Sequence, residues 1–133
     1  MNPYTPQANL ILGWLWIVLG FLSGSIIGLN FNFFRDDWLG GYSGLKRRLY
    51  RLGHISFFGL ALVNFIFYFT ARLFAEPGVM LKVASWGFIV GAITMPICCF
   101  VMAHFPRLKN LFYIPVMSLL TSGFFTLWEV VTR

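Results

Sequence analysis

Charged residues are scarce in this chain. Only four of its 133 residues are acidic and 11% are charged, whereas 59% are hydrophobic and 20% are aromatic. Soluble globular domains carry roughly 25% charged residues, so the composition excludes an ordinary soluble domain and predicts that lipid is the solvent. The net charge of +6 does not indicate a nucleic-acid partner, because the basic residues lie at the ends of apolar runs and do not gather in a solvated patch.

Residues that perform chemistry are equally few. The two cysteines, Cys98 and Cys99, are adjacent within an apolar run, so they form neither a disulfide framework nor a C-x-x-C redox pair. The chain has two histidines, His54 and His104, and lacks an H-E-x-x-H zinc motif, a Gly-Lys phosphate loop and a recognisable Ser/His/Asp set. No Lys or Arg precedes the first apolar run, which argues against a secretory signal. We therefore predict that the protein is not an enzyme.

Four long apolar runs dominate what remains. They cover approximately residues 10–34, 55–71, 83–103 and 111–131. About 20 apolar residues in a helix cross the hydrocarbon core of a bilayer. The sequence therefore predicts an all-α integral membrane four-helix bundle, with residues 1–133 as a single transmembrane domain.

The long polar interval, residues 35–54, separates the first two runs. Leu45, Leu49 and Leu52 recur at helical spacing, and the cations between them point to other faces. This pattern predicts a short basic amphipathic helix before the second span, running into it and lying at the membrane surface. The cations predicted to contact lipid headgroups are Lys46, Arg47, Arg48 and Arg51.

The distribution of basic residues predicts the orientation. The first and third loops hold seven of them (Arg35, Lys46, Arg47, Arg48, Arg51, Arg107 and Lys109), and the opposite side holds three (Arg72, Lys82 and Arg133). Loops rich in Lys and Arg face the cytoplasm. We expect both termini outside the cytoplasm, in a bacterial inner membrane.

Glycines recur on the faces of two spans. The positions predicted to pack helices together are Gly13, Gly20, Gly24 and Gly28 in the first span and Gly87 and Gly91 in the third. Small residues let helices approach closely where no hydrophobic effect drives association. Packing within the bundle is the favoured interpretation, and a homodimer contact is the alternative.

On the fourth span, a polar stripe of Ser118, Ser122, Thr126 and Glu129 also indicates packing, with Glu129 solvated near the end of the helix.

The two histidines are the first candidate site. His54 begins the second span and His104 ends the third, so antiparallel spans place them at the same depth. Imidazoles from neighbouring helices can ligate haem b or another metal. His104, however, falls on the side of its helix opposite Gly91 and Cys98. The alternative is a pair of interfacial histidines bonded to loop, lipid phosphate or water.

The sulfur-bearing face of the third span is the second candidate site. Met95, Cys98 and Met102 share this face, and soft sulfur ligands suit copper(I). The alternative is packing, because Met and Cys are common in apolar interiors.

On the second span, His54 shares a face with Ala61, Asn64 and Tyr68, and we expect that face to point inward.

Resemblance to known families extends only to size and helix number. The chain is similar in outline to small multidrug transporters, but those carry a glutamate in the first helix and spans one to three here contain no acid. It is similar in helix count to bacterial cytochrome b561 proteins, which need more histidines.

The sequence therefore favours a non-catalytic subunit or assembly partner of a larger membrane complex, whose partners are the bilayer and other membrane proteins or further copies of the chain. A haem- or copper-binding redox protein is the alternative, and a small-solute transporter is the third.

Overall fold

The described part of the chain, residues 6–30 and 35–132 of a computed structural model, consists of helices and their connections. Four helices are long: α1 (Gln7–Gly28), α2 (Leu45–Ala71), α3 (Val79–His104) and α4 (Tyr113–Thr132). Two short 3-10 helices, η2 (Trp38–Gly40) and η3 (Pro106–Phe112), precede α2 and α4. All four helical segments are long and apolar enough to span a membrane, so the predicted integral membrane four-helix bundle is confirmed.

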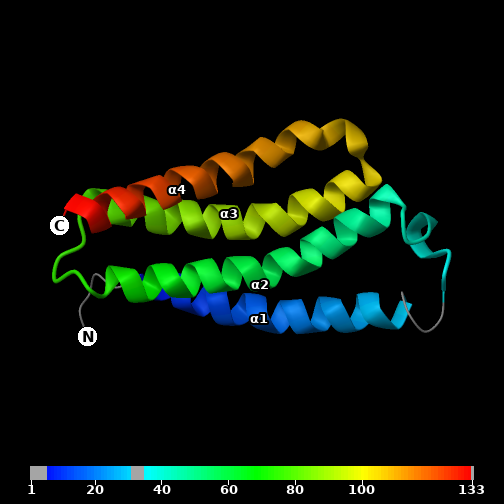
Figure 1. The fold of residues 1–133 in the computed structure, drawn as a ribbon, viewed down its shortest axis with the longest axis horizontal. Coiled ribbons are helices and arrows are strands. Elements are labelled where there is room, and N and C mark those ends of the chain that lie inside the picture. Colours follow the sequence, from blue (N-terminus) through cyan, green and yellow to red (C-terminus); the bar gives the residue numbers. More distant parts are fainter. Residues whose placement is uncertain (1–5, 31–34, 133) are drawn as a thin grey trace.

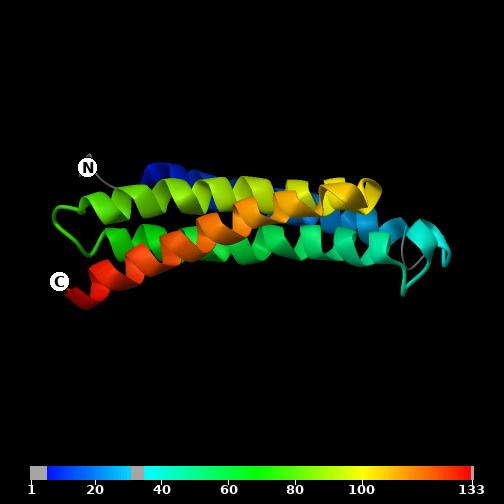
Figure 2. The same ribbon diagram turned by 90° about the horizontal axis from the view of Figure 1, so that it is seen from above.

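The helices pack in chain order. α1 lies along α2, α2 along α3, and α3 along α4, each antiparallel to the next (Figure 1). The start of α1, the turn between α2 and α3, and the end of α4 lie at one end of the bundle. The opposite end, formed by η2, the start of α2, the end of α3 and η3, is called the basic end below because the first and third loops lie there. Seen from above, α4 crosses α3 obliquely (Figure 2).

The predicted basic amphipathic helix forms the first turns of α2, which continues without a break into the second span. Gly53 does not interrupt it. A Cβ atom at Gly53 would lie 2.9 Å from the Phe100 ring, so this glycine permits α3 to approach α2. With 27 residues, α2 is about 40 Å long. A bilayer core is about 30 Å thick, so the charged first turns extend beyond the hydrocarbon.

Pro106 lies at a helix boundary, whereas Pro96 does not. α3 ends at His104, and Pro106 starts η3, where its missing N–H is tolerated. Pro96 lies inside α3, which nevertheless stays helical from Val79 to His104. Residues 31–34, on which the predicted end of the first span falls, lie outside the described residues; α1 itself ends at Gly28.

Two apolar clusters form the core. One contains Trp16, Phe57, Leu60, Ala61 and Ala92, and the other contains Phe67, Ala71, Leu81, Ala84 and Phe88. The outer faces keep large exposed apolar side chains, such as Trp14, which is 62% exposed. The edge helices bury narrow stripes: the buried residues of α4 are Pro115, Ser122 and Glu129, seven residues apart. Lipid or protein must therefore cover most of α4.

Candidate functional site

A buried polar cluster joins α1, α2 and α3 near the end opposite the basic end. Asn9 donates its side-chain amide to Asn64 Oδ1 at 2.8 Å and to the Ser85 carbonyl at 3.3 Å. The Ser85 hydroxyl donates in turn to Asn9 Oδ1. Both asparagines are 0% exposed. The three residues are called the Asn9 cluster.

The Asn9 cluster pairs its polar groups internally. Asn64 Nδ2 donates to the Leu60 carbonyl at 2.8 Å within its own helix. A polar side chain in a spanning helix needs a partner, because lipid offers none. The spacing of residues on α2 predicts that Asn64 faces inward, and Asn64 is buried. Asn9 lies in the first turn of α1, which begins at Gln7.

Trp16 makes a second bond across the bundle. Its indole Nε1 donates to the Ala92 carbonyl at 2.9 Å, and its ring meets Phe57 edge-on at 5.6 Å. Position near a helix end suggests an interfacial tryptophan, and Trp14 is indeed exposed, but Trp16 is a core residue. α1 is therefore bonded to both of its neighbours in the bundle.

His54 lies between α2 and α1. Its Nδ1 is 3.0 Å from the Ser23 hydroxyl, and its ring meets Phe58 edge-on. Gly24 leaves the space that this imidazole occupies, since a Cβ there would lie 2.6 Å from His54 Cε1. His54 is thus held in a fitted position against α1.

His104 contacts a different residue of α2. Its Nε2 is 2.8 Å from the Tyr50 hydroxyl. The Tyr50 ring packs edge-on against Trp38 from η2 and Phe100 from α3. This aromatic group ties the end of α3 to the start of α2.

The two imidazoles therefore do not converge on shared partners. His54 is bonded towards α1, and His104 is bonded to the tyrosine one helical turn earlier on α2. Ligation through His104 Nε2 would need that ring to leave the Tyr50 hydroxyl, whereas the contact of His54 with Ser23 uses Nδ1 and not Nε2. Among the described residues, no group of three or more His, Cys, Asp or Glu side chains is placed to hold a metal ion.

The sulfur side chains of α3 contact different parts of the molecule. Met95 packs against the core cluster around Trp16. The Cys98 thiol is 3.5 Å from the Leu111 carbonyl in η3, and Met102 lines a cavity of about 400 Å³ with Lys109 and Tyr113. Their common helical face thus spans a core contact and a cavity, and copper binding stays a prediction.

The glycines predicted to pack helices have unequal surroundings. Gly13 faces Phe65 and Gly20 faces Phe58, both from α2, in addition to the fit of Gly24 against His54. A Cβ at Gly28 would meet open space. The close approach of α1 to α2 therefore runs from Gly13 to Gly24.

The contact between α3 and α4 combines glycine with serine. A Cβ at Gly87 would collide with the Ser122 side chain, and one at Gly91 would lie 2.5 Å from Leu119. The Ser118 hydroxyl donates to the Gly87 carbonyl at 2.7 Å.

Further along α4, Glu129 is 6% exposed, which corrects the expectation that it is solvated. It lies on the stripe of α4 that packs against the bundle.

The predicted headgroup cations also divide into two kinds. Arg47 is 3% exposed, and its Nη1 donates to the Asp36 carbonyl at 2.8 Å, so this side chain holds the first loop against α2. It does not fit the role predicted for it. Lys46 and Arg48 are exposed, and the Arg51 guanidinium lies 4.5 Å from the centre of the Tyr42 ring.

Comparison with known proteins gives no relative. No family model, no curated protein and no solved structure matches the chain.

Proposed function

We propose that this protein is a non-catalytic subunit or assembly partner of a larger membrane complex, in a bacterial inner membrane, with the first and third loops in the cytoplasm. One observation carries the proposal: polar side chains between the helices are engaged in holding those helices together. The Asn9 cluster, Trp16 and Ser118 each bond across a helix contact. A catalytic or transport site needs polar groups directed at a ligand.

The position of α4 supports a role in assembly. This helix packs along α3 through a narrow stripe, and its other faces carry exposed Leu120, Phe124 and Leu127. Such a face is covered either by lipid or by another membrane protein. Large aromatic and aliphatic side chains pack well against a partner helix.

The first experiment is purification of the full chain in mild detergent, with mass spectrometry of copurifying proteins, a visible spectrum and metal analysis. We expect a colourless, metal-free protein with a stable set of membrane subunits. A Soret band lost in both His54→Ala and His104→Ala contradicts the proposal in favour of a haem protein. Stoichiometric copper lost in Cys98→Ala contradicts it in favour of copper binding.

A second experiment locates the partner. A photo-crosslinking amino acid at Leu127, on the outer face of α4, is expected to give a discrete product with another protein in intact cells. The matched control is the same amino acid at Leu62, which is similarly exposed on α2. A product containing only this chain identifies a homo-oligomer, and equal diffuse labelling from both positions contradicts a docked partner.

A further inference from the structure

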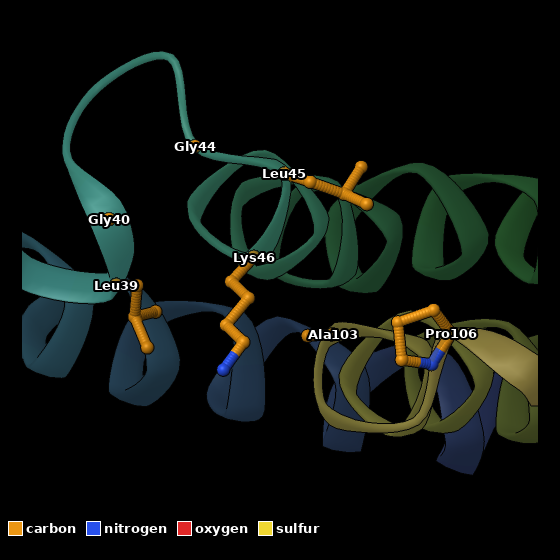
Figure 3. Close-up of a pocket in the computed structure, with 7 residues that line it drawn as sticks. All are labelled: Leu39, Gly40, Gly44, Leu45, Lys46, Ala103 and Pro106. Carbon is orange, nitrogen blue, oxygen red and sulfur yellow. The ribbon is translucent and has the colours of Figure 1, made fainter.

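A pocket opens at the basic end, beside the start of α2. It has a volume of about 440 Å³ and lies between the first loop, the first turn of α2 and the junction of α3 with η3. Its lining residues are Leu39, Gly40, Gly44, Leu45, Lys46, Ala103 and Pro106 (Figure 3). This volume is within the range of small-molecule sites, about 300 to 1,000 Å³.

Lys46 is the charged residue of the lining. Its side chain extends from α2 into the space between Leu39 on one side and Ala103 and Pro106 on the other (Figure 3). Within residues 6–30 and 35–132, its ammonium group makes no hydrogen bond or ion pair. An ammonium group has three donors to offer, and an anion in the pocket would accept from it.

The surroundings favour an anion. The first and third loops with the start of α2 hold seven basic residues against two acidic ones, Asp36 and Asp37, a net charge of +5. Positive charge concentrated at one end of a membrane protein attracts anionic headgroups.

The rest of the lining favours an amphiphile over a simple ion. Leu39, Leu45, Ala103 and Pro106 provide apolar walls, and Leu45 and nearby Phe105 are exposed. The length of α2 places this level beyond the hydrocarbon core, where phospholipid headgroups lie. A lipid would therefore meet Lys46 with its headgroup and the apolar walls with its glycerol and upper acyl chains.

The first loop is held in the shape that forms one wall. A Cβ at Gly44 would lie 2.8 Å from the Leu39 carbonyl oxygen, so the loop closes tightly on the start of α2. Leu39 has φ 53° and ψ 33°, a left-handed conformation that is uncommon outside glycine. Strained backbone of this kind concentrates at ligand-binding sites.

We propose that this pocket binds one anionic phospholipid, with Lys46 donating to its headgroup phosphate. This goes beyond diffuse attraction of headgroups by exposed cations, because it assigns one site and one lysine. It is independent of the proposed role in a complex, since a bound lipid requires no protein partner.

The test is native mass spectrometry of the full chain in detergent, titrated with dioleoyl phosphatidylglycerol, dioleoyl phosphatidylcholine or soluble glycerol phosphate. We expect one saturable phosphatidylglycerol, with at least fivefold weaker binding of phosphatidylcholine. Lys46→Gln should weaken phosphatidylglycerol binding about tenfold, the loss of one charge-assisted hydrogen bond. Lys46→Arg should retain binding.

Arg48→Gln is the matched control, because it removes the same charge from an exposed position that does not line the pocket. We expect less than a twofold effect. Equal weakening by Lys46→Gln and Arg48→Gln would overturn the site in favour of diffuse attraction, as would equal binding of the two lipids. Competition by glycerol phosphate at the same concentration as the lipid would overturn the lipid assignment and identify a soluble phosphate ligand. Circular dichroism of each variant verifies that the helices are intact.

Discussion

Asn9 and Asn64 lie 55 residues apart in the sequence, yet the amide of Asn9 donates to the side-chain oxygen of Asn64 at 2.8 Å. The bond fixes the register of α1 on α2. Because Asn9 also bonds to Ser85, it fixes both helices relative to α3. The end of the bundle opposite the basic end is thus held by hydrogen bonds, in a region where apolar packing alone specifies register weakly.

Loss of the Asn9 cluster should destabilise the bundle. We expect Asn64→Ala to lower the free energy of unfolding by about 1 to 2 kcal/mol, because it removes the bond and leaves the buried Asn9 amide without one of its partners. The measurement is unfolding in mixed micelles with increasing SDS, followed by circular dichroism.

The matched control for this prediction is Thr94→Ala. The Thr94 hydroxyl bonds to the Val90 carbonyl of its own helix, so its loss breaks no contact between helices. We expect a change of less than about 0.5 kcal/mol. Equal effects of Asn64→Ala and Thr94→Ala would show that the cluster contributes no specific stability.

The fit of Gly24 against His54 gives a second prediction. Gly24→Ala places a methyl group 2.6 Å from His54 Cε1, so the imidazole must move or the helices must separate. We expect a loss of about 1 to 3 kcal/mol in the same unfolding assay, the usual cost of overpacking. Gly28→Ala is the control, because the added methyl group meets open space. If the two variants are equally stable, α1 does not pack on α2 as described.

The contact of α4 with α3 gives a third prediction. A methyl group at Gly87 collides with Ser122 and disturbs the bond from Ser118 to the Gly87 carbonyl. We expect Gly87→Ala to loosen α4, which increases protease cleavage in the connection around η3. Gly123→Ala, on α4 itself, adds a methyl group in open space and should leave cleavage unchanged. Increased cleavage in both variants would indicate a general effect of losing glycine.

The fold could be predicted from the sequence because lipid imposes a simple rule. Each apolar run must be long enough to cross the bilayer and must satisfy its backbone internally as a helix. Lengths of apolar runs therefore predicted four helices, and the leucine spacing after residue 44 predicted the helical start of α2. Of the glycines predicted to pack in the first span, those from Gly13 to Gly24 lie against side chains of α2, whereas Gly28 meets open space.

The partners of individual polar residues could not be predicted in this way. Asn9, Arg47 and Glu129 each lie next to a helix end, where sequence alone suggests contact with water or headgroups. All three are buried. Asn9 bonds to the two neighbouring helices, Arg47 bonds to the first loop, and Glu129 is one of the buried residues of α4. Trp16 differs from Trp14 in the same way: helical rotation turns one indole to the core and the other outward.

The orientation gives a fourth prediction. Gln7 and Ser43 are both exposed. Gln7 starts α1 and Ser43 lies just before α2, and these two helices start at opposite ends of the bundle. In intact cells, a membrane-impermeant maleimide should label Gln7→Cys and should label Ser43→Cys only after permeabilisation, because the basic loop is predicted to face the cytoplasm. Cys98 and Cys99 are buried, so their background labelling should be low. The reverse labelling pattern would invert the proposed topology.

The two histidines give a fifth prediction. Ser23→Ala and His54→Ala should be coupled by about 0.5 kcal/mol or more in a double-mutant cycle, because their side chains are 3.0 Å apart. Tyr50→Phe and His104→Ala should be coupled to a similar extent through their 2.8 Å contact. His54→Ala and His104→Ala should instead be additive within about 0.5 kcal/mol, since the rings have different partners. Two ligands of one haem would lose the same cofactor in either single variant, so strong coupling between the histidines would contradict the separate roles that their hydrogen bonds assign to them.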